Sequence, residues 1–423
     1  MSDRAPDHAA HEHARSHAEN AIDFRKLERL ASSEEAAPPF SQRALDGGSP
    51  LRIVHVLRAP VGGLFRHVLD LAGEQAARRH RVGVIADSLT GGARAESALA
   101  ALAPRLALGL CRLPIRRLPH PSDLQALVAI SRRLNAWKAD VVHGHGSKGG
   151  AMARLAFGPD AKAIRVYTPH GGSLHFARGT PNHRLYMAME RLLQRRTDLL
   201  LFESRFAAER YEDFIGAPHG LARIVHNGLR PEEFAPVATA EGTADLLYVG
   251  EFRLLKGLDT LLAALKRLKD EGRPLRLLLV GAGGPDEASF LALAERLGVA
   301  GQIAVKPPTP AREAFALGRI LVVPSRAESL PYIVLEALAA QKPIVATKVG
   351  GVPEIFGCYA DRLIASDDPA ALARAIVRAL DEEAGKSAQS ARALEERVRA
   401  GFSLSRMADG AIAAYCEALA QKA

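Results

Sequence analysis

The fold can be inferred from one stretch of the sequence, RILVVPSRAESLPYIVLEALA, which spans residues 319–339. Its first six residues, 319–324, form a short apolar run rich in β-branched side chains, which predicts a buried strand. Residues 331–340 follow with helical apolar spacing, and we expect Ser329 to cap this helix and Pro331 to begin it. A buried strand followed closely by a helix is typical of the βαβ units that build parallel sheets.

The same alternation of strand-sized apolar runs and helical segments continues on both sides of this stretch. Before residue 230, the predicted strands are 51–57, 82–86, 140–145, 163–168, 198–202 and 222–226, with helices at 124–137 and 182–196. After residue 243, the further strands are 245–250, 274–281, 302–305 and 342–347, with helices at 258–269, 285–297, 369–400 and 403–421. The two series predict an α/β fold with two Rossmann-like βαβ domains facing a central cleft, where ligands bind at the carboxyl ends of the strands.

Composition divides the chain into further segments. Residues 1–50 combine histidines, acidic residues, prolines and glycines with little apolar periodicity, which is typical of a disordered tail. We expect the first domain over 51–230, a linker over 231–243, the second domain over 244–400 and a final helix over 401–423.

The chain has 423 residues, of which 48% are hydrophobic and 24% charged, a balance typical of a globular protein with a sizeable core. Its three cysteines lie far apart without a C-x-x-C pair, which excludes a disulfide scaffold and a cysteine-rich zinc site and fits a reducing compartment. No apolar run approaches the ~18–20 residues of a bilayer crossing, and the first 30 residues contain no apolar signal region. We therefore expect a cytoplasmic protein.

The net charge of +9 is concentrated in the first domain, where residues 51–230 hold 27 Lys and Arg against 13 Asp and Glu. Such a basic half favours an anionic partner, either a membrane surface or nucleic acid. Aromatic residues, on which nucleic-acid bases would stack, make up only 5% of the chain. We therefore expect an anionic membrane surface and no nucleic acid, with an ordinary solvated basic face as the alternative.

The helix expected over 182–196 is the candidate docking element. At about 100° per residue, Arg184, Arg191 and Arg195 fall on one stripe of this helix. The other side carries apolar residues that we expect to pack into the domain, namely Leu185, Met189, Leu192 and Leu193.

Two carboxylates flank the start of the helix that follows strand 319–324. Glu328 lies at the carboxyl end of the strand, whereas Glu336 lies in the second turn of an otherwise apolar helix, where a carboxylate needs a partner. Free backbone amides near Ser329 and Leu330 suit a phosphate. Two carboxylates beside a phosphate site could hold hydroxyl pairs on two sugar rings, and a capping box with a solvated glutamate is the alternative.

Two cationic residues follow the first strand of the second domain, and a pair of glycines follows the first strand of the first domain. Arg253 and Lys256 come directly after the first strand of the second domain, where they could neutralise a diphosphate or form a solvated basic loop. Gly62 and Gly63 follow the first strand of the chain and would let the backbone approach a ligand closely.

Histidines gather at predicted strand ends, at His143, His145 and His170. His143 and His145 resemble a metal-binding pair, but the sequence offers no evident third ligand, and each histidine taken singly is more typical of a hydrogen-bonded structural residue. The chain also contains no Asp-x-Asp motif that could bridge a metal ion to a diphosphate. We therefore expect no metal ion and no other cofactor.

Taken together, these residues resemble the retaining family-4 glycosyltransferases, which have the GT-B fold. The resemblance covers residues 51–421 and rests on an ordered set of motifs: Gly62-Gly63, VVHGHGSKGG (141–150), TPHGG (168–172), IVHNG (224–228), Gly250 with Arg253 and Lys256, and Glu328-x7-Glu336. The segment 401–423 resembles the helix that returns to the first domain in this fold.

The resemblance implies a role for each motif side chain. Arg253 and Lys256 would bind the diphosphate of the donor, and Glu336 would hold its ribose hydroxyls. Glu328 would contact hydroxyls of the transferred sugar, and His170 would lie beside that sugar.

The backbone around the cleft would complete the donor site. Amides near Ser329 and Leu330 would bind phosphate, and Gly63 would face the diphosphate across the cleft. Two departures stand out: Leu330-Pro331 replaces the Phe-Gly of many members and removes one amide, and the Lys-Pro-Pro of 306–308 replaces a common glycine near the expected base site.

The resemblance therefore implies a hexosyl- or N-acetylhexosaminyltransferase of the bacterial cell-surface polysaccharide type. It would move a sugar with retention from a nucleoside diphosphate sugar, UDP-linked by family frequency, to a glycan or lipid-linked acceptor. The first domain would face the acceptor and the second the donor. The enzyme would act as a peripheral protein at the inner face of the cell membrane. A nucleotide-sugar 2-epimerase of the same fold is the alternative, followed by a nucleic-acid-binding protein.

Overall fold

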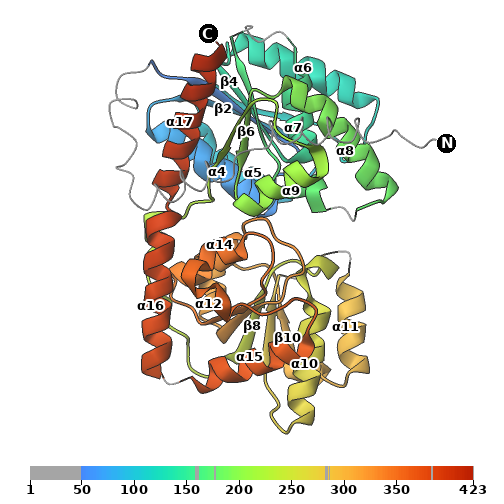
Figure 1. The fold of residues 1–423 in the computed structure, drawn as a ribbon, viewed down its shortest axis with the longest axis vertical. Coiled ribbons are helices and arrows are strands. Elements are labelled where there is room, and N and C mark those ends of the chain that lie inside the picture. The colour runs from blue at the N-terminus through green and yellow to red at the C-terminus, as the bar shows by residue number, and fades with distance from the viewer. Residues whose placement is uncertain are drawn as a thin grey trace, which may run out of the picture.

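The computed structural model describes residues 49–157, 162–175, 178–281, 284, 286–382 and 384–422. The tail predicted over residues 1–50 therefore lies almost entirely outside the described residues. Within the described ranges, two parallel sheets with helices between their strands form two domains (Figure 1). The predicted α/β class with two Rossmann-like domains is confirmed.

The first domain is built on a seven-stranded sheet in the order β3-β2-β1-β4-β5-β6-β7. Its strands are β1 Arg52–Leu57, β2 Arg81–Asp87, β3 Gly109–Leu113, β4 Val141–His145, β5 Ile164–Thr168, β6 Leu199–Phe202 and β7 Leu221–Ile224. Its helices are α4 Gly62–Ala77, α5 Gly92–Leu102, α6 Ser122–Ala136, α7 Gly146–Leu155, α8 Pro181–Leu193 and α9 Arg205–Ile215. The strands that the sequence predicts all form, and most of their apolar side chains are buried within the sheet, although those of the edge strand β7 are only partly buried. The sequence does not predict β3, a half-buried edge strand without β-branched residues.

The second domain is built on a five-stranded sheet in the order β10-β9-β8-β11-β12. Its strands are β8 Ala244–Val249, β9 Leu277–Val280, β10 Ile303–Lys306, β11 Gly318–Val323 and β12 Ile344–Ala346. Its helices are α10 Leu258–Asp270, α11 Glu287–Arg296, α12 Ala311–Phe315, α13 Tyr332–Ala339, α14 Val352–Phe356, α15 Pro369–Asp381 and α16 Ala384–Gly401. The single helical stretch expected over 369–400 is thus two helices, because the chain turns to an extended conformation at Glu382.

The chain crosses between the domains twice, and the two crossings pair with each other. Leu229, on the first crossing, donates its amide to the carbonyl of Phe402 at 2.8 Å, and Leu404 donates its amide to the carbonyl of Leu229 at 2.7 Å. After the second crossing, helix α17 (Leu404–Lys422) packs its apolar face against the first sheet and α4. Helices α16 and α17 consequently run along one side of the molecule, one on each domain (Figure 1).

Candidate active site between the two domains

The carboxyl ends of the two sheets meet between the domains, where side chains of one domain contact the other. Arg66 of α4 pairs with Glu336 of α13. Ser329, which follows β11, donates its hydroxyl to Glu203 Oε1, after β6, at 2.6 Å. The candidate residues predicted from sequence lie on the loops and helix starts around this junction.

Lys256 and Glu328 form the central polar contact of the second domain. Lys256 Nζ donates to Glu328 Oε1 at 2.7 Å, and Ser325 Oγ donates to the same oxygen at 2.7 Å. The Glu328 side chain is only 9% exposed, whereas that of Lys256 is 33% exposed, so the ammonium can still reach a ligand. Arg253 lies outside this contact, since its half-exposed guanidinium pairs at 3.5 Å with Glu251.

Two glycines hold these loops against each other. Gly257, which follows Lys256, has φ +66°, and an added Cβ would lie 1.9 Å from the carbonyl oxygen of Pro324. Gly350 has φ +57°, and its added Cβ would lie 1.8 Å from the carbonyl oxygen of Glu328. Only glycine fits both the left-handed backbone and the close approach, so the position of the Lys256–Glu328 pair is fixed by the backbone.

Ser329 does not cap the following helix, contrary to the sequence-based expectation. Helix α13 begins at Tyr332, its N-cap is Pro331, and no side chain caps it. The Ser329 hydroxyl instead crosses to Glu203 of the first domain. Burial raises the pKa of Glu203, and the hydrogen bond from Ser329 and the backbone of His170 oppose that rise. Glu203 thus connects the residue after Glu328 to the His170 loop.

Glu336 has the partner that its position in an apolar helix requires. Arg66 donates to Glu336 Oε1, donates to both carboxylate oxygens of Glu233 at 2.7 Å, and lies 4.3 Å above the ring of Tyr332. Burial raises the pKa of Glu336, and Arg66 opposes that rise. Gly63 also faces this helix across the domain boundary, since an added Cβ would lie 3.4 Å from the Tyr332 ring.

Leu330 is buried, and its backbone joins the two domains. The carbonyl oxygen of Leu330 accepts a hydrogen bond at 2.8 Å from the side-chain amide of Asn227, which lies in the first domain just before the first crossing. Gly62 opens α4 with φ +65°, on the loop directly after β1. Both residues therefore lie at the junction that the sequence predicts for them.

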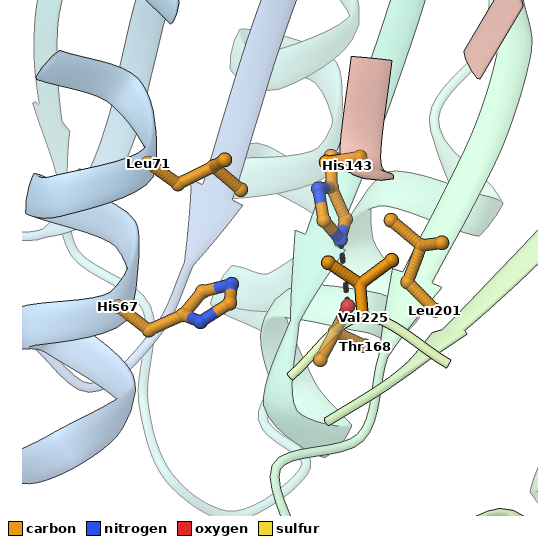
Figure 2. A pocket seen from close by; sticks show the side chains of 7 residues that line it. His67, Leu71, His143, Thr168, Leu201 and Val225 are labelled. Carbon is orange, nitrogen blue, oxygen red and sulfur yellow. Dashed lines mark hydrogen bonds between the residues drawn. The ribbon is translucent and has the colours of Figure 1, made fainter. Parts of the chain in front are cut away.

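The first domain contributes a cluster of histidines at this junction: the buried His55, His67, His143 and His145, and the partly buried His170. Burial lowers the pKa of His55 and of His67 to about 4, and lowers the pKa of the other three well below the ordinary value. All five imidazoles are therefore neutral at pH 7. Figure 2 shows His67 extending from α4 toward the sheet, where His143 is hydrogen-bonded to Thr168.

Hydrogen bonds fix which nitrogens of three neutral rings carry the proton. His55 Nε2 must donate to Gln75 Oε1, at 2.8 Å, because an amide oxygen only accepts. His55 Nδ1 then accepts from His145 Nε2 at 2.9 Å, and His145 Nδ1 accepts from His170 Nε2 at 3.1 Å. This chain leaves Nδ1 of His170 as a hydrogen-bond acceptor. His170 itself has φ +52°, an unusual backbone conformation for a non-glycine residue.

Several residues at the junction are marked by no motif or spacing in the sequence. Glu354 of α14 accepts the backbone amides of Arg205 and Phe206, at 2.8 and 2.9 Å, and so caps α9 of the other domain. Glu203 and Arg66 bridge the domains as described above. The position of Glu203 directly after a predicted strand could have marked it, because the other candidates also follow strands.

The fold and the site together define a two-domain protein of the Rossmann-like type, in which carboxylates, cations and helix starts of the two domains face each other across the junction. Family models match both halves of the chain: "Glycosyltransferase Family 4" covers residues 61–233, and "Glycosyl transferases group 1" covers residues 230–400. The chain is 32% identical over 325 residues to the putative glycosyltransferase EpsD of Bacillus subtilis, which covers 67% of this chain and 82% of EpsD. The protein therefore belongs to the group 1, family-4 glycosyltransferases, and the predicted family and enzyme class are confirmed.

Other similar proteins include a D-inositol 3-phosphate glycosyltransferase of Catenulispora acidiphila, 31% identical over 52% of this chain and 58% of that protein. Among solved structures, sucrose-phosphate synthase of Thermosynechococcus elongatus superposes with a TM-score of 0.70 at 20% identity, over 88% of this chain and 100% of that one. Anabaena HepE in complex with UDP-glucose superposes with a TM-score of 0.69 at 17% identity, over 87% of this chain and 99% of HepE. These likenesses establish the GT-B fold.

Proposed function

We propose that this glycosyltransferase moves a sugar, with retention of configuration, from a UDP-sugar to a glycan or lipid-linked acceptor in cell-surface polysaccharide synthesis. The observation that carries the proposal is the Lys256–Glu328 contact at the domain junction, which places a cation and a carboxylate 2.7 Å apart. Sugar transfer develops negative charge on the leaving diphosphate and positive charge on the sugar ring. A cation and a carboxylate fixed in advance at one place suit these opposite charges.

Each remaining candidate has a task in this scheme. Lys256 and the exposed Arg253 bind the diphosphate, while Glu328 contacts the hydroxyls of the transferred sugar. Glu336 holds the ribose, and its pairing with Arg66 of the first domain fixes the orientation of the carboxylate. The acceptor nitrogen Nδ1 of His170 takes a hydrogen bond from a sugar hydroxyl. The leaving phosphate accepts the proton of the attacking acceptor, so the scheme needs no metal ion.

The choice of donor is supported by a neighbouring fold. HepE was solved with UDP and with UDP-glucose, which favours a uridine nucleotide and a hexosyl donor. The names of the relatives bear on the acceptor in one case. The name of EpsD specifies no acceptor, whereas the D-inositol 3-phosphate glycosyltransferases indicate a small phosphorylated acceptor as a second candidate.

A screen of purified enzyme tests this proposal. We expect UDP to raise the melting temperature more than GDP or single-stranded DNA does. We expect a UDP-sugar to release UDP when membrane-extracted acceptors are added, and D-inositol 3-phosphate serves as the parallel acceptor. Stabilisation by DNA alone would indicate a nucleic-acid-binding protein. Conversion of the sugar without transfer would indicate a nucleotide-sugar 2-epimerase.

The membrane component of the proposal rests on α8, whose exposed face differs from the sequence-based expectation. Leu185, Met189 and Leu192 do not pack into the domain: they are 55%, 38% and 66% exposed. Arg184 and Arg195 are exposed on the same helix and its short extension. An exposed face that combines apolar and basic side chains fits an anionic lipid surface better than a purely basic one.

Within the described residues, no helix is both long and apolar enough to cross a bilayer. We therefore propose a peripheral attachment through α8, at the inner face of the cell membrane, with the apolar side chains in the headgroup region. Arg191 takes little part, because its guanidinium donates to the carbonyls of Phe214 and Ile215 at the end of α9.

Reversing the charges of Arg184 on α8 and of Arg195 on the short helix that follows it tests this attachment. The double variant Arg184→Glu, Arg195→Glu should bind anionic vesicles at least about tenfold more weakly, since each basic residue near the surface contributes about 1 kcal/mol. The binding of the parent protein should fall steeply as salt rises. Co-sedimentation measures both effects, and UDP release without acceptor should be unchanged.

The matched control reverses two charges of the second domain, Lys266→Glu with Arg267→Glu on α10, and should leave vesicle binding nearly intact. If the α8 variant sediments with anionic vesicles as well as the parent does, α8 is not the docking surface.

A further inference from the structure

The histidine cluster of the first domain has the composition of a transition-metal site. The described residues contain two groups of three histidines whose possible ligand atoms all lie within 4.8 Å of one another. One group is His55, His143 and His145, and the other is His67, His145 and His170. Neutral imidazole is the ligand that zinc, copper and nickel share, and no thiolate belongs to either group.

Hydrogen bonding distinguishes the two groups. Both ring nitrogens of His143 are engaged, with Tyr415 and with Thr168 at 2.8 Å each, and both nitrogens of His55 are engaged as well. A metal ion at the first group would have to break several of these bonds. The second group loses only the hydrogen bond between His145 and His170.

His67 is already held as a metal ligand would be. Its Nδ1 donates to Asn227 Oδ1 at 2.9 Å, and the Asn227 amide is oriented by its own bond to the carbonyl of Leu330. Nε2 of His67 therefore carries a lone pair, and no described residue donates to it. A ring whose second nitrogen donates to a fixed oxygen is the usual arrangement of metal-bound histidine.

We propose that His67, His145 and His170 bind one divalent transition-metal ion, with zinc as the expected occupant. His67 supplies Nε2 and His145 supplies Nδ1. The ion lies between His145 Nδ1 and His170 Nε2, where His170 Nε2 carries a proton in the metal-free protein. That proton moves to Nδ1 of His170, and His170 binds the ion through Nε2. Zinc–nitrogen bonds of ~2.0–2.1 Å require the ligand atoms to be about 3.4 Å apart, which small ring rotations supply.

The site has a consequence for transfer, and this part rests on the proposed function. His170 cannot both bind the ion through Nε2 and keep Nδ1 as an acceptor for the sugar, because Nδ1 carries the proton in the metal-bound tautomer. Bound zinc therefore inhibits transfer. The diphosphate contacts of Lys256 lie in the other domain and do not involve the ion.

Cobalt titration of the metal-free, full-length protein tests the site without any assay of activity. Co²⁺ in a site of three histidines and one water gives intense visible absorption, whereas a hydrated or surface-bound ion does not. We expect one such ion per chain in the parent protein, displaced by zinc. The variants His67→Gln and His170→Gln should weaken this binding at least about 100-fold. The exposed His120→Gln variant should bind as the parent does, and circular dichroism checks the fold of each variant.

Two outcomes would overturn the assignment. Either the parent gives no such absorption, or both His67→Gln and His170→Gln keep it while His143→Gln loses it, which would place the ion at the other group. The transfer assay separates the two parts of the proposal. Binding without inhibition leaves the metal site intact and contradicts the role of His170 beside the sugar.

Discussion

Replacing Lys256 with alanine is expected to lower the rate of sugar transfer by at least about 100-fold, the order of one lost transition-state donor. The Lys256 ammonium pairs with the Glu328 carboxylate at the domain junction, and its nitrogen lies 2.7 Å from Glu328 Oε1. Its side chain is 33% exposed, so the change should cost little stability. Initial rates of UDP release in the presence of acceptor measure the effect.

The matched control for this change is Lys266→Ala, which removes a half-exposed lysine of α10 that pairs with Asp270. That variant should transfer at the parent rate. Arg253→Ala should also slow transfer, because Arg253 is the second cation of the diphosphate site. Near-normal turnover in the double variant Arg253→Ala, Lys256→Ala would contradict the assignment of the diphosphate contacts.

Glu328→Gln is expected to lower kcat by about 100-fold or more while UDP binds as well as before or more tightly. The glutamine keeps the size of the side chain and still accepts from Ser325, but it removes the negative charge that faces the developing positive charge of the sugar. It also releases Lys256 from a competing carboxylate, which favours the diphosphate. Calorimetric UDP titration and steady-state kinetics separate the two quantities.

The exposed Glu271→Gln, at the end of α10, is the control and should change neither quantity. A large loss of UDP affinity in Glu328→Gln, with kcat retained, would place the Glu328 carboxylate on the nucleotide rather than on the sugar.

The sequence predicts the two sheets well because buried parallel strands are short apolar runs separated by helices. It misses β3, since that edge strand is only half buried and needs no such run. It also places Lys256 and Glu328 each at the carboxyl end of a strand, and the carboxyl ends of parallel strands share one edge of a sheet. Their direct contact follows from the adjacency of β8 and β11, which no local pattern encodes.

The partners that cross the domain junction could not be predicted from local patterns. Glu336 needs a cation, but Arg66 lies 270 residues away in the other domain. The spacing around Ser329 suggests a helix cap, and a carboxylate from the other domain takes its hydroxyl instead. The third histidine of the metal site, His67, sits on a helix, and only the fold brings it beside the strand-end histidines.

The apolar periodicity of α8 predicts the wrong buried face, because part of the face that packs into the domain is polar. Its buried face carries His183, Met187, Glu190 and Leu193, of which two are polar. Glu190 is buried because it pairs with Arg154 of α7 at 2.8 Å, a buried charge pair that hydropathy does not reveal. The helix is therefore rotated relative to the expected orientation, and its leucines reach the surface.

In the proposed reaction the protein's own cations, and no metal ion, stabilise the departing diphosphate. The most direct test is the rate of UDP release from a UDP-sugar in the presence of acceptor, measured with and without excess EDTA. We expect an unchanged rate, or a higher one where bound zinc is removed. Complete loss of transfer in EDTA, restored by magnesium or manganese, would contradict it.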